Sequence, residues 1–139
     1  MVKTKKIRLD TKGHTDIVDI TPEVAKILSE SETNDGVVTV FMPGSTASIT
    51  TIEFESGLVK DDLPKALEGI APTGVKYAHD SAWGEGNGHA HVRASIVGPG
   101  LTIPFSQGEL MLGTWQQIVL IDYDNRPRSR EIIVQILGE

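Results

Sequence analysis

Two apolar stretches constrain the fold of this chain more than any other feature. Residues 37–42 read V-V-T-V-F-M and residues 118–121 read I-V-L-I, so neighbouring positions are apolar in both. Neighbouring side chains of a strand point to opposite faces of the sheet, so a strand that is apolar throughout is covered on both faces. Both stretches are therefore predicted to be central strands of a sheet.

Shorter patterns account for the rest of the chain. Further strands are predicted at residues 5–10, 15–20, 48–53, 101–105, 109–112 and 131–137. The first two are predicted to form a hairpin through Lys12-Gly13. Helices are predicted to begin at Thr21-Pro22, near Asp61-Asp62 and after Asn87. This order predicts one α+β domain over residues 1–139, whose large, mainly antiparallel sheet carries two to three helices on one side.

The composition narrows the classes of partner. The net charge of −6 argues against a nucleic-acid or anionic-membrane surface, because such surfaces cluster Lys and Arg. The chain has no cysteine, which excludes disulfides, thiolate metal ligands and cysteine nucleophiles. No segment approaches the roughly 20 apolar residues of a membrane span, and the N-terminus lacks an apolar signal core. We therefore expect a cytoplasmic protein that binds neither nucleic acid nor membrane.

The stretch 83–100, W-G-E-G-N-G-H-A-H-V-R-A-S-I-V-G-P-G, concentrates polar chemistry in a short segment. On a strand, His89 and His91 would face the same way and could share a zinc ion with His79 or Glu53 as a third ligand. On a helix the two rings lie about 200° apart and cannot close on one metal. The glycine-rich start and the Gly-Pro end of the stretch favour a helix.

A helix at this position predicts an anion site. Asn87 would be its N-cap, and the free backbone N–H groups near Gly88 would favour a phosphate at the positive end of the helix dipole. His91 and Ser95, four residues apart, would share one face, while Arg93 would share another face with the first histidine. Burial of either histidine in the core is the alternative.

A small-residue loop and a carboxylate are predicted to complete such a site. In the loop at residues 43–47, Ser45 and Thr46 offer hydroxyl and backbone N–H groups to an anion, although a plain connection between strands is the alternative. Glu53, at the end of the following strand, is a candidate for acid–base work or a solvated strand end. We expect Glu53 and the two hydroxyls to face His91 across a phosphate-sized pocket.

Two other segments add candidates. Residues 80–88 contain three glycines and no periodicity, which predicts a loop that shapes the site. Trp115 and Gln116 begin a buried strand. The indole either anchors the edge of the sheet or offers a stacking surface to a flat heterocycle, with the amide beside it.

Taken together, these residues resemble the YjbQ-like family over nearly the whole chain. The resemblance rests on Pro43 with Ser45-Thr46-Ala47, Glu53, Tyr77 with His79-Asp80, His91 with Arg93 and Ser95, Gly98, Ile103-Pro104, Gly113-Thr114-Trp115-Gln116 and Gly138-Glu139. It implies a compact α+β fold that assembles as a homotrimer, and an activity named secondary thiamine-phosphate synthase. It also implies functional roles for His79, Asp80, His91, Arg93 and Glu53.

The implied reaction joins a pyrimidine diphosphate to a thiazole phosphate with loss of pyrophosphate. Arg93 and the N–H groups near Gly88 would hold phosphate, and His91 or His79 would be the general acid. The Ser45-Thr46 loop would hold the second substrate. Mg²⁺ on the diphosphate would use two acidic candidates, Glu53 and Asp80.

The alternative is a module that binds a phosphorylated metabolite or a divalent ion such as Zn²⁺ without catalysis. Its candidate metal ligands are His79, His91 and Glu53. The chain also departs from the family at two positions: many members have a histidine where this chain has Gly44, and a serine where it has Gly100. A mechanism or metal site that uses the loop histidine therefore does not transfer.

Overall fold

The computed structural model describes all 139 residues. It contains eight strands and four α-helices, with a π-helical segment, η1, directly before α2. The strands are β1 (Val2–Thr11), β2 (Asp16–Asp19), β3 (Gly36–Phe41), β4 (Ala47–Glu53), β5 (Gly100–Ser106), β6 (Glu109–Leu110), β7 (Gln116–Asp122) and β8 (Arg128–Gly138). The helical segments are α1 (Thr21–Glu30), η1 (Leu58–Asp62), α2 (Leu63–Ile70), α3 (Ala78–Trp83) and α4 (Gly88–Val97).

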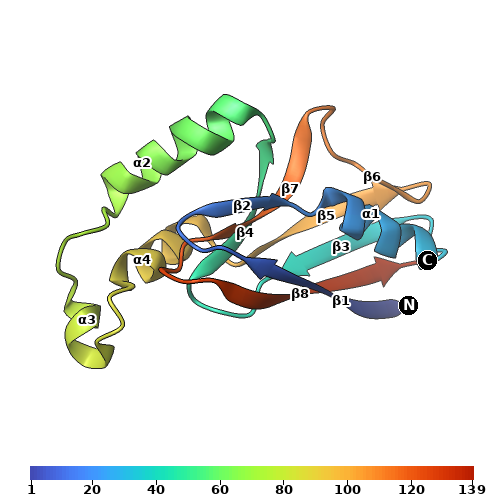
Figure 1. Cartoon of the computed structure of the whole chain (residues 1–139). Helices are drawn as coiled ribbons and strands as arrows, with labels where there is room; N and C mark the ends of the chain where they lie inside the picture. Colours follow the sequence, from blue (N-terminus) through green and yellow to red (C-terminus); the bar gives the residue numbers. More distant parts are fainter.

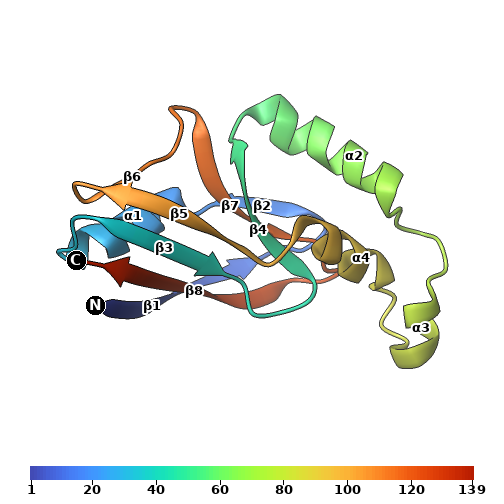
Figure 2. The ribbon, with the colours of Figure 1, turned by 180° about the vertical axis from the view of Figure 1, so that it is seen from behind.

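The strands form two antiparallel sheets. Five strands pair in the order β1-β8-β3-β5-β6, and three pair in the order β2-β7-β4. Helix α1 lies in front of the five-stranded sheet in Figure 1, whereas β3 and β5 are in front in the reverse view of Figure 2. The prediction of an α+β domain built on a large antiparallel sheet is confirmed. None of the helices is both long and apolar enough to cross a membrane.

The two central strands differ in what covers them. In β7, Ile118 and Leu120 belong to the main core, while Val119 and Ile121 on its other face belong to a second core beneath α2 and α4. In β3, Val38 and Val40 are fully buried, but Phe41 on the opposite face is 42% exposed. The prediction of two covered faces therefore holds for β7. For β3 the prediction is wrong, because no helix or strand of the chain covers the face of the five-stranded sheet on which Phe41 lies.

The predicted hairpin between the first two strands is also wrong. β1 pairs along its whole length with β8, whereas β2 pairs with β7 in the other sheet. The chain changes sheet at His14 and Thr15, which both have positive φ, 54° and 63°. That conformation is uncommon outside glycine. These two residues turn the chain out of the five-stranded sheet and into β2 of the three-stranded sheet.

The segment from η1 to α3 extends away from the sheets before the chain returns through α4 (Figure 1). Leu67 of α2 packs with Ala90 and Ala94 of α4 in the second core. Helix α3 contacts the start of α4 through Asp80 and His79, as described below. This segment places α3 beside the start of α4, where the candidate site lies.

Candidate functional site

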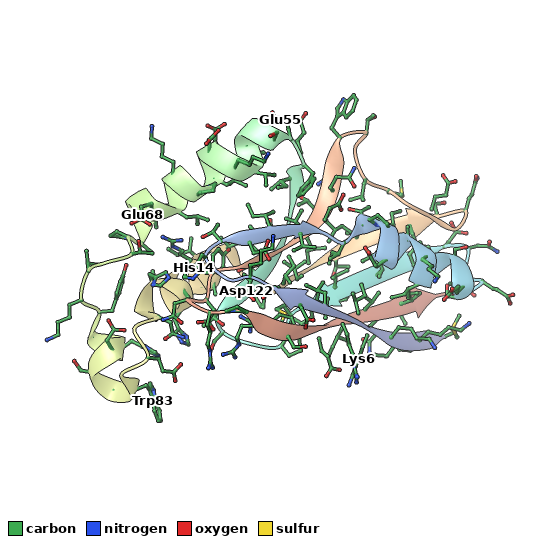
Figure 3. The ribbon with its side chains drawn as sticks, in the orientation of Figure 1. Lys6, His14, Glu55, Glu68, Trp83 and Asp122 are labelled. Atoms are coloured by element: carbon green, nitrogen blue, oxygen red, sulfur yellow. The ribbon has the colours of Figure 1, made fainter.

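A cavity of about 870 Å³ opens where the ends of the two sheets meet α3 and α4. Its residues come from both sheets and from the helical segment. They are Lys6 and Arg8 of β1, residues 42–46 of the β3–β4 loop, His79, Trp83, Glu85, Asn87, His91, Asp124, residues 128–131 and Ile133. A volume of this size is within the ordinary range for small-molecule sites. In Figure 3, Trp83 and Lys6 point toward the lower side of the molecule, with Asp122 in the interior between them.

Two histidines lie together on the wall of the cavity. The ring centroids of His79, from α3, and His91, from α4, are 4.2 Å apart, with their planes tilted by 36°. Burial lowers the pKa of His91, and the adjacent His79 lowers it further, while Asp124 and Glu85 act in the opposite direction. His91 is therefore held in its neutral form near pH 7, when it can accept a proton.

His79 is placed by a short helix, α3, which also takes up the start of the loop predicted at residues 80–88. Asp80 starts α3 by accepting the backbone N–H of Tyr77 at 3.1 Å, as in a capping box. A helix of six residues is too short for its periodicity to show in the sequence. Nδ1 of His79 is buried and has no hydrogen-bond partner within the chain.

The start of α4 is already occupied by a carboxylate. The other oxygen of Asp80 accepts the backbone N–H of Gly88 at 3.4 Å. A Cβ at Gly88 would lie 2.5 Å from Cβ of Tyr77, so only glycine allows this close packing of α3 on α4. Gly88 is not among the residues that line the cavity. The helix is confirmed, but its N-terminus faces Asp80, so the predicted phosphate position there is not formed.

Asn87 precedes α4 without capping it through its side chain. Its Nδ2 instead donates to Oδ1 of Asp124 at 3.2 Å and to Oε2 of Glu85 at 3.4 Å. The residue is only 2% exposed, and it lines the cavity. Its Oδ1 atom has no partner within the chain.

Thr46 belongs to a buried hydrogen-bond network beneath the cavity. Its hydroxyl donates to Oδ2 of Asp124 at 3.0 Å and accepts from Nη2 of Arg130 at 2.7 Å. Arg130 also donates to both oxygens of Asp122, at 2.7 and 2.9 Å. The hydroxyl of Thr46 thus makes its hydrogen bonds within the protein, whereas Ser45 is exposed and lines the cavity.

Burial and hydrogen bonding compete at the two carboxylates of this network. Burial alone would raise the pKa of Asp122, but hydrogen bonds from Arg130 and Thr11 hold it below its usual value. Burial also opposes ionisation of Asp124, and the backbone N–H of Asn125 with the side chains of Asn87 and Thr46 lowers its pKa. Both groups are therefore ionised at neutral pH.

The sequence-based predictions missed these acidic and basic residues. Asp122 is the last residue of the buried strand β7, Asp124 lies two residues beyond it, and Arg128 and Arg130 lie at the start of β8. The signal was an alternating D-x-D next to an alternating R-x-R, because side chains two apart on a strand share a face. The predicted strand at 131–137 began three residues too late to show this pattern.

Arg93 lies outside the cavity, contrary to its predicted role at a phosphate. Its guanidinium donates to the carbonyl oxygen of Ala71 at 3.0 Å, to Oγ1 of Thr15 at 3.0 Å and to Oε2 of Glu68 at 2.9 Å. The side chain is 4% exposed. Arg93 therefore links α4 to the end of α2 and to the β1–β2 turn.

Three further candidates do not meet His91 across the cavity. Ser95 is exposed, and its hydroxyl donates to the carbonyl oxygen of His91 at 2.6 Å. Glu53 ends β4 opposite Gln116 of β7. β4 begins beside Thr46, so these two positions lie roughly 20 Å from the cavity along the strand. Glu55, just beyond Glu53, is at the upper side of Figure 3.

The predicted stacking surface is at the same remote end. Trp115 is 73% exposed, and Gln116 donates to Oγ1 of Thr51 at 2.9 Å and accepts the backbone N–H of Gly113 at 3.0 Å. The indole that does line the cavity is that of Trp83, which is also 73% exposed.

The cavity is positively charged relative to the protein as a whole. Its lining holds four cations against three carboxylates, whereas the chain carries a net charge of −6. Lys6 and Arg8 share one partner, Glu131, at 3.3 and 3.7 Å, and Arg128 lies 3.5 Å from Asp124. We call Lys6, Arg8 and Arg128 the cationic rim.

The predicted metal ligands are not brought together. His79 and His91 are adjacent, but Glu53 is remote, and the chain has no group of three or more His, Asp or Glu side chains arranged to hold a metal ion. Gly44 lies in the cavity lining, where an added Cβ would approach nothing closer than 3.4 Å. Its φ of +144° is a conformation that side-chain-bearing residues rarely adopt, so the backbone of this loop favours glycine at position 44.

The chain is similar to a set of proteins without an assigned function. The family model described as "UPF0047 protein YjbQ-like" matches residues 5–139. A UPF0047 protein of Methanocaldococcus jannaschii is 37% identical over 134 residues, covering 96% of this chain and 94% of that protein. The UPF0047 protein YugU of Bacillus subtilis is 32% identical over 139 residues, covering 99% and 100%.

Solved structures show the same fold. A crystal structure from Sulfolobus solfataricus P2, described as a YbjQ-like protein of unknown function, matches with a TM-score of 0.94 and 32% identity over 100% of this chain and 99% of that one. A hypothetical protein from Aeropyrum pernix K1 matches with a TM-score of 0.90 and 28% identity over 99% of each chain.

We expect loss of Arg130 to lower the free energy of unfolding much more than loss of Arg8. Arg130→Met should lower the free energy of unfolding by about 3–5 kcal/mol, because it leaves the carboxylate of Asp122 buried without its cation. Arg8→Met should change it little, because Arg8 and Glu131 are both solvent-exposed. Urea unfolding of both variants at neutral pH checks this. Equal losses would show that the buried pair does not stabilise the fold.

The histidines predict a pH dependence of stability. The pKa values of His89 and His91 are both lowered below 6.5, chiefly by burial. The unfolded chain then binds more protons than the folded chain as the pH falls through 6.5, so the free energy of unfolding should decrease there. Asp122 and Asp124, with pKa values below 3.8, contribute only at much lower pH.

Urea unfolding between about pH 7.5 and about pH 5 measures this slope. His91→Gln should make the slope shallower, because one of the two depressed groups is removed. A wild-type stability that does not change over this interval would contradict the placement of both histidines.

Proposed function

The chain belongs to the UPF0047 YjbQ-like family, and we propose that it is an enzyme that binds a small phosphorylated molecule in the cavity and transfers protons through His91 and His79. The observation that carries this proposal is the contact between the two imidazole rings, 4.2 Å apart, on the wall of a cavity with a cationic rim. Two adjacent imidazoles cannot both be protonated without repulsion. One of them is therefore available as a base while the other can donate a proton.

The rim is the part of the cavity suited to phosphate. Lys6 and Arg8 share a single carboxylate, so a second anion can approach them. Phosphate would thus lie against β1 and the start of β8, rather than at the N-terminus of α4. The free energy of this contact comes from charge-assisted hydrogen bonds to exposed guanidinium and ammonium groups, so binding should weaken with salt.

The acid–base roles follow from where each ring is held. The ring nitrogen that attacks in the reaction described below carries no proton, so that step needs no base. A proton held on the His79–His91 pair would pass to the departing diphosphate oxygen as its bond to carbon breaks. The buried ion pair fixes the β3–β4 loop through Thr46, and this loop also lines the cavity. No step of this scheme requires Glu53, Asp80 or Arg93.

The specific reaction we propose is thiamine-phosphate synthase-like. A ring nitrogen of a thiazole phosphate forms a bond to the methylene carbon of a pyrimidine diphosphate, and the bond from that carbon to the diphosphate oxygen breaks. Pyrophosphate then leaves as the second product. The indole of Trp83 at the cavity edge offers the surface on which a flat heterocycle would stack, the role predicted for Trp115.

A non-catalytic phosphate-binding module is the second candidate, because the rim does not depend on the histidines. One experiment separates the two. Pyrophosphate release from the paired substrates is measured for wild type, His91→Asn and His14→Asn, and pyrophosphate binding is measured by calorimetry for each. His14 is the matched control, since it is exposed and outside the cavity.

For an enzyme, His91→Asn should lower turnover by about 10²–10⁴-fold while pyrophosphate still binds, because a general acid–base group is lost but the rim is intact. His14→Asn should retain wild-type turnover. Binding without release above background in the wild type would favour the binding module. If the wild type neither binds pyrophosphate nor releases it from the paired substrates, both candidate functions are excluded.

We also propose that three copies of the chain assemble through the uncovered face of the five-stranded sheet. Phe41 and Leu137 on this face are 42% and 53% exposed, and Ile133 is the cross-strand neighbour of Phe41. Exposed apolar side chains on a sheet face that no helix covers are typical of interaction surfaces. Ile133 also lines the cavity, so this assembly would place each cavity beside a subunit boundary.

Light scattering during size-exclusion chromatography tests the assembly. The expected mass is three times that of the 15.0 kDa chain. Phe41→Asp should shift the mass toward one chain, because it places a charge in the interface. A single-chain mass for the wild type would contradict the trimer.

A further inference from the structure

The amide of Asn87 has one satisfied end and one unsatisfied end. Its Nδ2 donates to Asp124 and Glu85, and carboxylates at neutral pH only accept hydrogen bonds. The two carboxylates therefore fix which end of the amide is which. They leave Oδ1 as a buried acceptor without a partner in a residue that is 2% exposed.

Such an atom is rare in a folded protein. Most buried polar atoms have a partner, and an unpaired one costs the free energy of its lost hydration. Asn87 lines the cavity, so the partner of its Oδ1 can come from a molecule in the cavity. His79, on the same wall, also has a buried ring nitrogen without a partner.

Charge is not uniform over the cavity lining. The cationic rim suits an anion, whereas Glu85 and Asp124, the two carboxylates bonded to Asn87, present acceptor oxygens and negative charge. The two regions adjoin at Arg128, which lies 3.5 Å from Asp124. A phosphate or carboxylate next to Oδ1 of Asn87 would add a further anion beside the two carboxylates. A hydroxyl or amino group would meet the acceptor it needs.

We infer that the molecule bound in this cavity carries a hydroxyl or amino group apart from its phosphate, and that this group donates a hydrogen bond to Oδ1 of Asn87. Asn87 is thereby the residue that selects phosphorylated alcohols and amines over phosphorylated compounds without such a donor. This inference rests on the proposed binding of phosphorylated molecules, and it specifies their class.

Wild-type protein and two sets of simple compounds test the inference. The first set is ethyl, propyl and butyl phosphate, and the second is the same three compounds with a hydroxyl at the far end of the chain. Three lengths are used because the span from the rim to Asn87 must be matched. For at least one length, the hydroxylated compound should bind about tenfold or more tightly than its plain partner, measured by calorimetry.

Two variants assign the preference to Asn87. Asn87→Ala should abolish the preference for the hydroxyl while leaving the affinity for plain alkyl phosphates within about threefold. Asn125→Ala is the matched control: its side chain donates to the backbone carbonyl of Glu85 at 2.9 Å, so it loosens the same loop without removing the acceptor. This control should keep the preference.

The outcomes separate the inference from the function on which it rests. If plain alkyl phosphates bind but the hydroxyl does not raise the affinity at any chain length, the bound molecule makes no hydrogen bond to Oδ1 of Asn87. The inference is then overturned, while phosphate binding stands. If neither set binds, both are overturned. If Asn87→Ala does not fold, a wild-type crystal with the preferred compound decides, because its hydroxyl must lie within hydrogen-bond distance of Oδ1.

Discussion

The buried pair between Arg130 and Asp122 is the interaction on which the rest of the structure depends. Asp122 ends β7 of the three-stranded sheet, and Arg130 lies near the start of β8 of the five-stranded sheet. Two charges lose their hydration on burial, and only a complete set of hydrogen bonds offsets that cost. Thr11 and Thr46 supply the remaining bonds, so four strand ends are fixed at one corner. The cavity lies directly above this corner.

Two other polar residues position the helices that close the cavity. Arg93 joins α4 to the end of α2, and Asp80 joins α3 to the start of α4. Both residue types often bind ligands, and here both are occupied by the protein itself. Their effect on function is indirect, because they place His79 of α3 against His91 of α4. The contact between His79 and His91 therefore depends on how α3 packs on α4.

Much of the fold could be predicted from the sequence, and less of the site. The buried strand β7 and the helix α4 follow from local apolar and glycine patterns, and the structure has both. Five predicted site residues do line the cavity: Ser45, Thr46, His79, Asn87 and His91. Glu53 was misplaced because β4 starts at the cavity and runs away from it. Asp122 and Arg130 were missed because each looked like an ordinary residue at a strand end.

The sequence by itself determined the class of the fold and the helical state of residues 88–97, because apolar spacing and glycine positions act over a few neighbouring residues. Only the tertiary structure decided which polar groups face the cavity. Arg93 and Asp80 find partners inside the protein, while Asn87 and His79 each keep a buried atom without one. Hydrogen-bond partners and burial come from residues distant in the chain, and no local pattern encodes them.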